Sequence, residues 1–376
     1  MSTNNPVPQG QFQKPQDAKQ SAGTVMLYRL AIALVIVVAT ATAPSAQPTY
    51  RLQNNGELWV SRADTCKGKP CVSWHLLDND PITLEVTAGV ANGPFDSLNA
   101  PPNGAPLYQR RSDGKILRYT GKPCRNGKCL GWEILEDNKS IASIVAAGRE
   151  HLYKRHHDGA IYGTTCNPDG SCRPWQQLDN INPDTVEISA GGVPEMTELY
   201  KRHKDGEIWR YTGTPCRNGK CLGWELLDHQ NPETAEIIAT VLRTSAGRLV
   251  QVLYKRHKNG EIWRYCSSEG NCRGWTKLDD QQSENQRAIS IVATAVDLYQ
   301  LRNDGSILVY KPNLPCPSGR CPGWQLLDQN AQNRQIAAGP KSFYKRHENG
   351  AIWRYTETGW ELLYDPSTLT IVSTQN

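Results

Sequence analysis

Three sets of residues have the types and the spacing to hold a sugar. Each set contains a tyrosine, an arginine two residues later, then a tryptophan and a second tyrosine on the following stretch. Aromatic rings pack against the apolar faces of sugars, and arginine hydrogen-bonds their hydroxyl groups. The alternative is that arginine stacks on tryptophan inside the fold as a cation–π pair, which we favour for any single residue. The candidate ligand-binding residues are Tyr200, Arg202, Trp209, Tyr211, Tyr254, Arg256, Trp263, Tyr265, Tyr344, Arg346, Trp353 and Tyr355.

All twelve cysteines fall into six local pairs, and a seventh copy of the surrounding sequence lacks both members. Zinc would need four ligands close together, usually from cysteines separated by two residues, and these pairs do not meet that pattern. In an exported chain the pairing predicts disulfides. The expected bonds are Cys66–Cys71, Cys124–Cys129, Cys166–Cys172, Cys216–Cys221, Cys266–Cys272 and Cys316–Cys321.

A Lys-Arg-His tripeptide recurs at 154–156, 201–203, 255–257 and 345–347. One interpretation is a basic belt that binds sulfated or acidic glycans. Neighbouring residues of a strand point to opposite faces, however, which separates the arginine from the lysine and the histidine. We therefore favour strand residues that pair with nearby acidic groups.

These residues recur because one pattern is repeated seven times. The turn glycines from Gly56 to Gly350 are separated by six intervals that average 49 residues. A period of about 40 to 50 residues with strand-like content is typical of a β-propeller. We expect a single all-β domain over 47–376, a seven-bladed propeller of four-stranded antiparallel blades.

Every copy carries Asn-Gly or Asp-Gly between its first two long strands, which predicts a two-residue type I′ turn. With that turn, Arg202 lies opposite Trp209 and Tyr200 lies opposite Tyr211, all on one face.

We expect a short Ile-Ala strand innermost, because small residues suit a crowded centre, and a tryptophan-containing strand outermost. The outer tryptophan occurs in all seven copies, so we interpret it as structural: Trp74, Trp132, Trp175, Trp224, Trp275, Trp324 and Trp360. The aspartate that follows it in five copies is expected to accept hydrogen bonds from the backbone or from arginine: Asp78, Asp179, Asp228, Asp279 and Asp328. Glu136 and Tyr364 hold that place in the other two copies.

The first copy has no Ile-Ala strand before it, so we expect 369–373 to complete the first blade and close the ring, hiding both sheet edges. Two long connections, at 90–106 and 241–252, are expected to project from one face of the ring.

The net charge of +5 is too small to indicate nucleic-acid binding. Residues 1–25 are polar and predict a disordered leader. Residues 26–46 resemble a signal peptide, with an uncleaved anchor as the alternative, and Met26 is a candidate start. Asn138 begins a glycosylation sequon. We expect a secreted protein.

The order Trp-x-x-Leu, Ile-x-Ala, Leu-Tyr, Asp-Gly-x-Ile-Trp resembles the repeat of tectonin and tachylectin-like propellers over about 49–374. Those families are mostly glycan-binding, with sugars held between or beside blades. The resemblance therefore implies multivalent, weak glycan binding at inter-blade pockets. The paired cysteines are not a standard feature of those families.

No motif indicates an enzyme, a metal site or a cofactor, because His-Glu-x-x-His, Gly-x-Ser-x-Gly and phosphate-binding glycine loops are absent from the sequence. We predict a lectin-like protein without enzymatic activity. The alternative is an extracellular scaffold that binds proteins through its two long loops.

Overall fold

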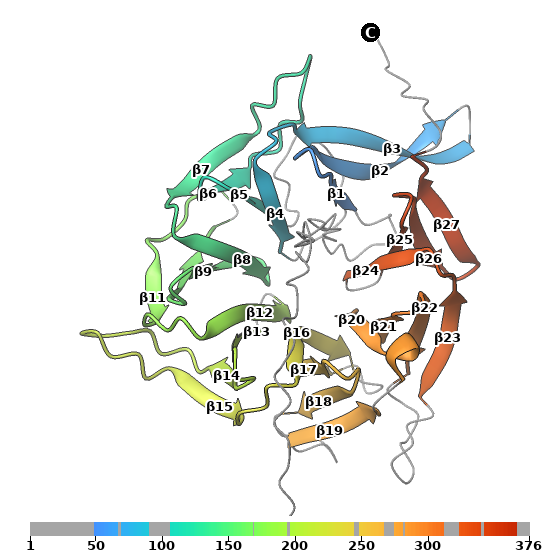
Figure 1. Cartoon of the computed structure of the whole chain (residues 1–376). Coiled ribbons are helices and arrows are strands. Elements are labelled where there is room, and N and C mark those ends of the chain that lie inside the picture. Colours follow the sequence, from blue (N-terminus) through green and yellow to red (C-terminus); the bar gives the residue numbers. More distant parts are fainter. Residues whose placement is uncertain are drawn as a thin grey trace, which may run out of the picture. The chain divides into compact units, whose positions relative to one another are not determined.

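The computed structural model describes residues 49–66, 69–89, 106–167, 169–193, 196–243, 248–266, 274–280, 283–311, 323–339 and 342–366. Within these residues, seven antiparallel sheets stand around a common centre (Figure 1). Six sheets have four strands and the first has three. The predicted seven-bladed, all-β propeller is confirmed.

Each sheet is one blade, numbered here in chain order. Blade 1 contains β1 (Tyr50–Leu52), β2 (Leu58–Cys66) and β3 (Lys69–Asp78). Blade 2 contains β4 (Thr83–Ala88), β5 (Leu107–Arg111), β6 (Lys115–Tyr119) and β7 (Trp132–Asp137). Blade 3 contains β8 (Ile141–Ala147), β9 (His151–His156), β10 (Ile161–Thr165) and β11 (Gln176–Asp179). Blade 4 contains β12 (Thr185–Val193), β13 (Met196–His203), β14 (Ile208–Tyr211) and β15 (Trp224–Asp228).

Blade 5 contains β16 (Thr234–Arg243), β17 (Leu249–His257), β18 (Ile262–Cys266) and β19 (Gly274–Asp279). Blade 6 contains β20 (Ala288–Ala293), β21 (Leu298–Arg302), β22 (Ser306–Tyr310) and β23 (Trp324–Gln329). Blade 7 contains β24 (Asn333–Gly339), β25 (Ser342–His347), β26 (Ile352–Thr356) and β27 (Gly359–Tyr364). A short 3₁₀ turn, η1 (Glu284–Gln286), precedes blade 6.

The order of strands within a blade follows the prediction. In blades 2 to 7 the Ile-Ala strand lies toward the centre and the tryptophan strand lies at the rim (Figure 1). The predicted connection at 241–252 is largely a continuation of the inner hairpin, because β16 and β17 stay paired as far as Arg243 and Leu249. β12 and β13 stay paired in the same way as far as Val193 and Met196.

Several predictions fall outside the described residues. These are the leader at 1–25, the signal at 26–46, the connection at 90–105 and the closing strand at 369–373. In the described part of the chain, no helix is long and apolar enough to span a membrane. Asn138 lies between β7 and β8, where its side-chain oxygen accepts a hydrogen bond from Ser140 N at 2.9 Å.

The predicted type I′ turn is wrong, and the error changes the register. His203 N donates to Glu207 O (2.9 Å), and Gly206 N donates to His203 O (3.0 Å), so the loop contains three residues and ends in a glycine bulge. Only the glycine has a positive φ, +86° at Gly206. The side chain of Asp205 instead accepts a hydrogen bond from Glu207 N at 3.1 Å, and all seven copies form the equivalent bond.

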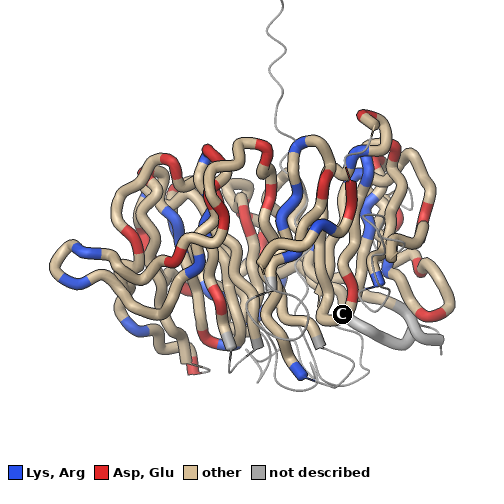
Figure 2. Tube along the Cα trace, turned by 90° about the horizontal axis from the view of Figure 1, so that it is seen from below, with Lys and Arg blue, Asp and Glu red and all other residues tan. Residues whose placement is uncertain are grey.

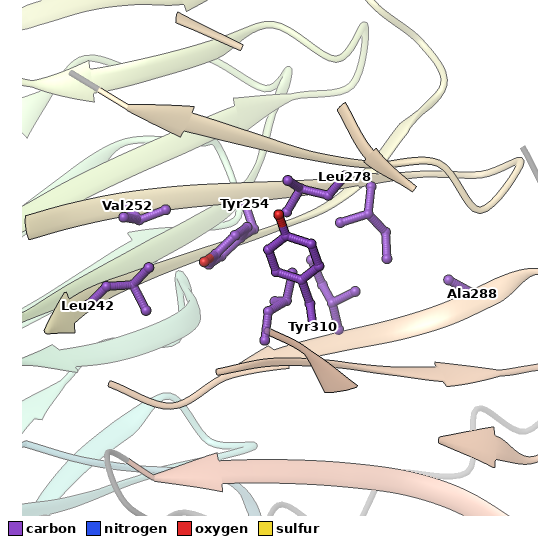
Figure 3. Close-up of a cluster of buried hydrophobic side chains, with 9 residues drawn as sticks. Leu242, Val252, Tyr254, Leu278, Ala288 and Tyr310 are labelled. Atoms are coloured by element: carbon purple, nitrogen blue, oxygen red, sulfur yellow. The ribbon is translucent and has the colours of Figure 1, made fainter. Parts of the chain in front are cut away.

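Apolar side chains join each blade to the next. In Figure 3, Leu242, Val252, Tyr254 and Leu278 of blade 5 pack with Ala288 and Tyr310 of blade 6. Similar clusters lie between the other pairs of blades. The core is therefore a ring of seven interfaces, and residues that point sideways from a blade are interface residues. The cluster between blades 7 and 1 includes Val72 and Trp74 packed against Leu363.

Three predicted disulfides are confirmed: Cys124–Cys129, Cys166–Cys172 and Cys216–Cys221. Each lies in the loop between the third and fourth strands of its blade. The other three pairs involve side chains outside the described set.

Candidate functional site

The three-residue turn divides each predicted ligand-binding set between the two faces of its blade. The structure pairs Tyr200 with Arg210, Lys201 with Trp209, and Arg202 with Ile208. Because a shift of one residue moves a side chain to the opposite face, Trp209 shares its face with Lys201 and not with Arg202. The prediction that Arg202 and Tyr200 lie opposite Trp209 and Tyr211 is therefore wrong.

Lys201 is held in a buried cage between blades 3 and 4. Its ammonium lies 5.5 Å from the ring of Trp209 and 4.5 Å from the ring of Trp224, both in its own blade. Asp179 of blade 3 accepts a hydrogen bond from Nζ at 2.5 Å. Lys201 is only 5% exposed. The cage therefore satisfies a buried cation and links two blades.

The same cage recurs with the acid on the preceding blade. Lys154, Lys255 and Lys345 contact Glu136, Asp228 and Asp328 at 3.1, 2.5 and 2.6 Å. Each lysine lies over two aromatic rings: Tyr162 and Trp175, Trp263 and Trp275, or Trp353 and Trp360. The acidic residues after the outer tryptophan thus accept hydrogen bonds from the next blade. We predicted backbone or arginine donors, but in these four copies the donor is lysine.

Two of the three blades that lack a caged lysine change three residues together. In blade 2, Gln109 replaces the lysine, Leu117 replaces the tryptophan and Arg111 replaces the histidine. Asp78 then accepts hydrogen bonds from Gln109 (2.8 Å) and Arg111 (3.2 Å). Blade 6 repeats the change with Gln300, Leu308 and Arg302 around Asp279. The inner ring is absent from the two blades in which glutamine replaces the cation, whereas in blade 1 Arg51 replaces the lysine and lies 5.5 Å from the ring of Trp59. This indicates that the ring serves the cation.

The arginine of two of the sets, Arg202 and Arg256, bridges to the other neighbouring blade. Arg202 Nε donates to Glu187 at 2.6 Å, and Nη1 donates to the Thr234 carbonyl of blade 5 at 3.2 Å. The second oxygen of Glu187 accepts a hydrogen bond from Ile237 N at 3.3 Å. Burial raises the pKa of Glu187, although Arg202 opposes the shift. Arg256 pairs with Glu236 in the same way, and Arg346 pairs with Gln335.

The tyrosines of the sets are placed differently from one another. Tyr200, Tyr254 and Tyr344 are buried in blade interfaces. Tyr211, Tyr265 and Tyr355 pack against the outer tryptophans, with ring centroids 5.2–5.3 Å apart. Of the twelve candidates, Tyr211 also borders an open groove that is described below.

The histidines beside the caged lysines are neutral groups in the interfaces. His203 contacts the Trp209 ring at 6.1 Å, and His257 and His347 contact the equivalent tryptophans. Burial, reinforced by the adjacent lysine, lowers the pKa of these three histidines and of His156. The Lys-Arg-His tripeptide is thus divided between faces and paired internally, as we predicted, and is not a basic belt.

Five of the outer tryptophans fasten their blade to the one before it. Trp224 Nε1 donates to the Leu178 carbonyl at 2.8 Å, and Trp132, Trp275 and Trp324 make equivalent bonds. Trp74 Nε1 donates to the Leu363 carbonyl at 3.1 Å, which joins blade 1 to blade 7. The structural interpretation of these tryptophans is confirmed for these five residues.

A group with metal-ligand character lies at one turn. Ligand atoms of His203, Asp205 and Glu207 lie within 4.8 Å of one another. The side chain of Asp205, however, accepts a hydrogen bond from the backbone N–H of Glu207, and the side chain of Glu207 accepts one from Trp209 Nε1 at 3.1 Å. The same contacts occur in blade 5, where Asn259 replaces the aspartate. The group therefore stabilises the turn.

A groove of about 1090 Å³ opens between blades 3 and 4 and reaches Gln251 of blade 5. Its aromatic walls are Tyr153, Trp175 and Tyr211. Gly163 forms part of the floor, and it occupies the position that Arg210 fills in blade 4. Without a side chain at Gly163, the space that an arginine fills in the next interface stays open.

The groove combines aromatic rings with several polar groups. Glu198 accepts a hydrogen bond from the Tyr200 hydroxyl, and Arg210 lies 3.9 Å from Glu198 and 2.6 Å from Glu225. Burial raises the pKa of Tyr211 to about 12, raises that of Glu198 and lowers that of His151. Arg173 and Gln176 are exposed on the outer wall. The groove thus offers aromatic faces, donors and acceptors, the groups that a sugar requires.

The sequence signal for the groove was a glycine at one position of the repeat. Blades 4, 5 and 7 read Ile-Trp-Arg-Tyr, and the third position of this motif holds arginine in blade 2 and valine in blades 1 and 6, whereas blade 3 reads Ile161-Tyr162-Gly163-Thr164. That change was visible, but only the register shows that the missing arginine faces the next blade.

No family model matches this chain, and no curated protein matches it. The chain is similar in structure to Sqt1 of Saccharomyces cerevisiae, with 14% identity over 89% of this chain and 85% of that chain and a TM-score of 0.50. Yeast RCC1 (Prp20), solved with Kap60, is 11% identical over 70% and 74%, with a TM-score of 0.48. The SapL1 lectin, solved with α-methyl fucoside, is 17% identical over 80% and 97%, with a TM-score of 0.43. At these identities, the similarity shows the propeller fold alone.

Proposed function

We propose that this protein is an exported, carbohydrate-binding propeller whose main sugar site is the groove between blades 3 and 4. The observation that carries the proposal is the loss of the arginine at Gly163, which leaves an open space beside Tyr153 and Tyr211. The three disulfides suit an oxidising, extracellular compartment. The other candidate residues have internal partners, so their role in sugar binding stays a prediction.

A glycan array with the purified chain tests the proposal, followed by titration calorimetry with the strongest ligand. Gly163→Arg should abolish binding because the new side chain fills the groove, as Arg210 does in the next interface. Gln176 lies opposite Gly163, where Glu225 lies opposite Arg210, and it can accept the new guanidinium. The nearest side-chain atoms, of Leu178 and Tyr153, lie 2.9 and 3.0 Å from the position of an added Cβ and must shift slightly.

A second variant separates lost binding from lost folding. Arg173→Ala removes an exposed side chain from the outer wall and should weaken binding without lowering the melting temperature. Lys139→Ala, at an exposed site in another connection, is the matched control. If the array shows no glycan above background, the proposal is wrong, and the protein-binding scaffold becomes the preferred function.

A further inference from the structure

Two nearly identical basic hairpins protrude from the rim of the ring. They are the disulfide-closed segments 124–129 and 216–221, both with the sequence Cys-Arg-Asn-Gly-Lys-Cys. In Figure 1, the loops between β6 and β7 and between β14 and β15 extend outward from the ring. In Figure 2, the loop that protrudes at the left carries basic residues near its tip. We call these two segments the basic hairpins.

The basic hairpins have a rigid backbone. Arg125 and Lys128 exchange backbone hydrogen bonds of 3.0 Å across an Asn-Gly turn. Asn126 and Gly127 have φ angles of +49° and +73°, so the type I′ geometry expected elsewhere occurs here. The second hairpin repeats this pairing between Arg217 and Lys220. A disulfide and a tight turn together fix the two basic side chains of each hairpin close to one another.

Each hairpin is also fastened to the preceding blade. Cys124 N donates to the Leu76 carbonyl of blade 1 at 3.0 Å, and Cys216 N donates to the Gln177 carbonyl of blade 3 at 3.0 Å. Asn180 Nδ2 adds a bond to the Gly219 carbonyl at 3.0 Å. These contacts use the backbone of the hairpin and leave its charged side chains toward solvent.

The four cations differ from other lysines and arginines of the ring. Arg125, Lys128, Arg217 and Lys220 are exposed, and none forms an ion pair with another described residue. By contrast, the lysines and arginines on the strands of blade 4 are paired with Asp179, Glu187 and Glu225. The strand cations of blade 4 are thus neutralised internally, whereas the four hairpin cations form no ion pair with another described residue.

The loop between the two basic hairpins does not share their charge. The disulfide loop of blade 3, 166–172, has no basic residue, and its Asp169 bonds Ser171. The sequence repeats this distinction: loops with four residues between the cysteines are basic, at 66–71 and 316–321 as well, whereas 266–272 contains Glu269. Positive charge is therefore found in the disulfide loops that have four residues between their cysteines.

We propose that the basic hairpins bind a linear anionic polysaccharide that runs along the rim of the ring. Two exposed cations on a preorganised hairpin suit sulfate or carboxylate groups, and ordering them costs little. The hairpins lie two blades apart and point outward in different directions (Figure 1), so a flexible chain can contact both while a flat surface cannot. This site is separate from the groove at Gly163.

The competing partner is an anionic bilayer, because each hairpin is followed by a highly exposed leucine. Leu130 is 78% exposed and Leu222 is 81% exposed. Binding to vesicles containing phosphatidylglycerol therefore forms one arm of the test, beside heparin as a sulfated polymer, polygalacturonate as a carboxylated polymer and dextran as a neutral one.

The test compares two fourfold variants of the full chain with equal loss of charge. Arg125→Ser/Lys128→Ser/Arg217→Ser/Lys220→Ser should weaken binding to heparin or polygalacturonate at least about tenfold. The slope of log K against the logarithm of the salt concentration should also become less steep by about 3, because four contacts are lost and each contributes about 0.7 to the slope. The control variant is Lys139→Ser/Lys204→Ser/Lys258→Ser/Arg334→Ser. These exposed residues lie in turns and connections, or at the start of β24 in the case of Arg334, at the ends of the strands opposite the basic hairpins. The control should change binding less than about twofold.

Equal losses in the two variants would show a net-charge effect and overturn the proposal. The proposal would also be overturned if the wild-type protein bound neither heparin nor polygalacturonate more tightly than dextran. Tighter binding to the vesicles than to both polymers would overturn it as well. Gly163→Arg should leave binding to the polymer intact, so failure of the sugar groove and failure of the basic hairpins are distinguishable. The melting temperature of each variant under non-reducing conditions confirms folding.

Discussion

The caged lysine predicts a measurable coupling between Lys201 and Trp209. Lys201→Gln removes a cation that contacts Asp179 at 2.5 Å and two tryptophan rings at 5.5 and 4.5 Å. A charged hydrogen bond exceeds a neutral one by about 1 kcal/mol, and a desolvated cation–π contact contributes about 1 to 2 kcal/mol. With two rings, we expect Lys201→Gln to lower the free energy of unfolding by about 3 to 5 kcal/mol.

The double variant isolates the ring's contribution. Trp209→Leu removes packing in either background, but it removes a cation–π contact only when Lys201 is present. The two changes should therefore be less than additive by about 1 to 2 kcal/mol. Adding His203→Arg to the Lys201→Gln/Trp209→Leu double variant reproduces in blade 4 the arrangement of Gln109, Leu117 and Arg111 in blade 2. The added arginine should restore about 1 kcal/mol of the free energy of unfolding through a new ion pair with Asp179.

Urea unfolding followed by far-ultraviolet circular dichroism under non-reducing conditions measures each free energy. Gln300→Lys in blade 6 is the matched control, because Leu308 provides no ring and Arg302 already pairs with Asp279. It should not stabilise the protein. Coupling below about 0.5 kcal/mol between Lys201 and Trp209 would refute the cage as a linked unit.

Three further predictions address the interfaces and the turns. Trp224→Phe leaves the Leu178 carbonyl without its donor and should cost about 1 to 3 kcal/mol. Trp360→Phe should cost less in the same unfolding assay, because Trp360 Nε1 has no hydrogen-bond partner within the described part of the chain. The histidines at 156, 203, 257 and 347 have lowered pKa values in the folded state, so the unfolded state binds more protons as the pH falls. The free energy of unfolding should decline below about pH 6.5, and His203→Gln should flatten that decline; equal stability at pH 7 and pH 5 would contradict this. Gly206→Ala combines a φ of +86° with a Cβ only 1.7 Å from the Asn231 carbonyl oxygen and should lower the melting temperature sharply, whereas Gly127→Ala, with open space around it, should cost about 1 kcal/mol.

The repeat predicted the architecture well because its signals are local. Asp205-Gly206 marks the hairpin, and the small residues of the Ile-Ala strands mark the centre of the ring. The turn type was the point of failure, because Asp-Gly suits both a type I′ turn and a three-residue loop with a glycine bulge. The difference of one residue reversed the face of Trp209.

The candidate site could be predicted only in part for the same reason. The residue types of Arg202 and Trp209 suit a sugar, but their partners lie on neighbouring blades, and sequence spacing within one repeat does not show them. The joint change of Gln109, Arg111 and Leu117 was present in the sequence, yet its meaning depends on the contact with Asp78 across an interface. Gly163 was likewise informative only once its neighbours were known.

The stoichiometry of glycan binding tests the central claim most directly. If the repeated residues hold the blades together and the groove at Gly163 binds the sugar, titration calorimetry with a monovalent glycan should give one site per chain, lost in Gly163→Arg. Three or more equivalent sites, unaffected by Gly163→Arg and lost when Trp209, Trp263 and Trp353 are substituted in a protein that remains folded, would contradict the account.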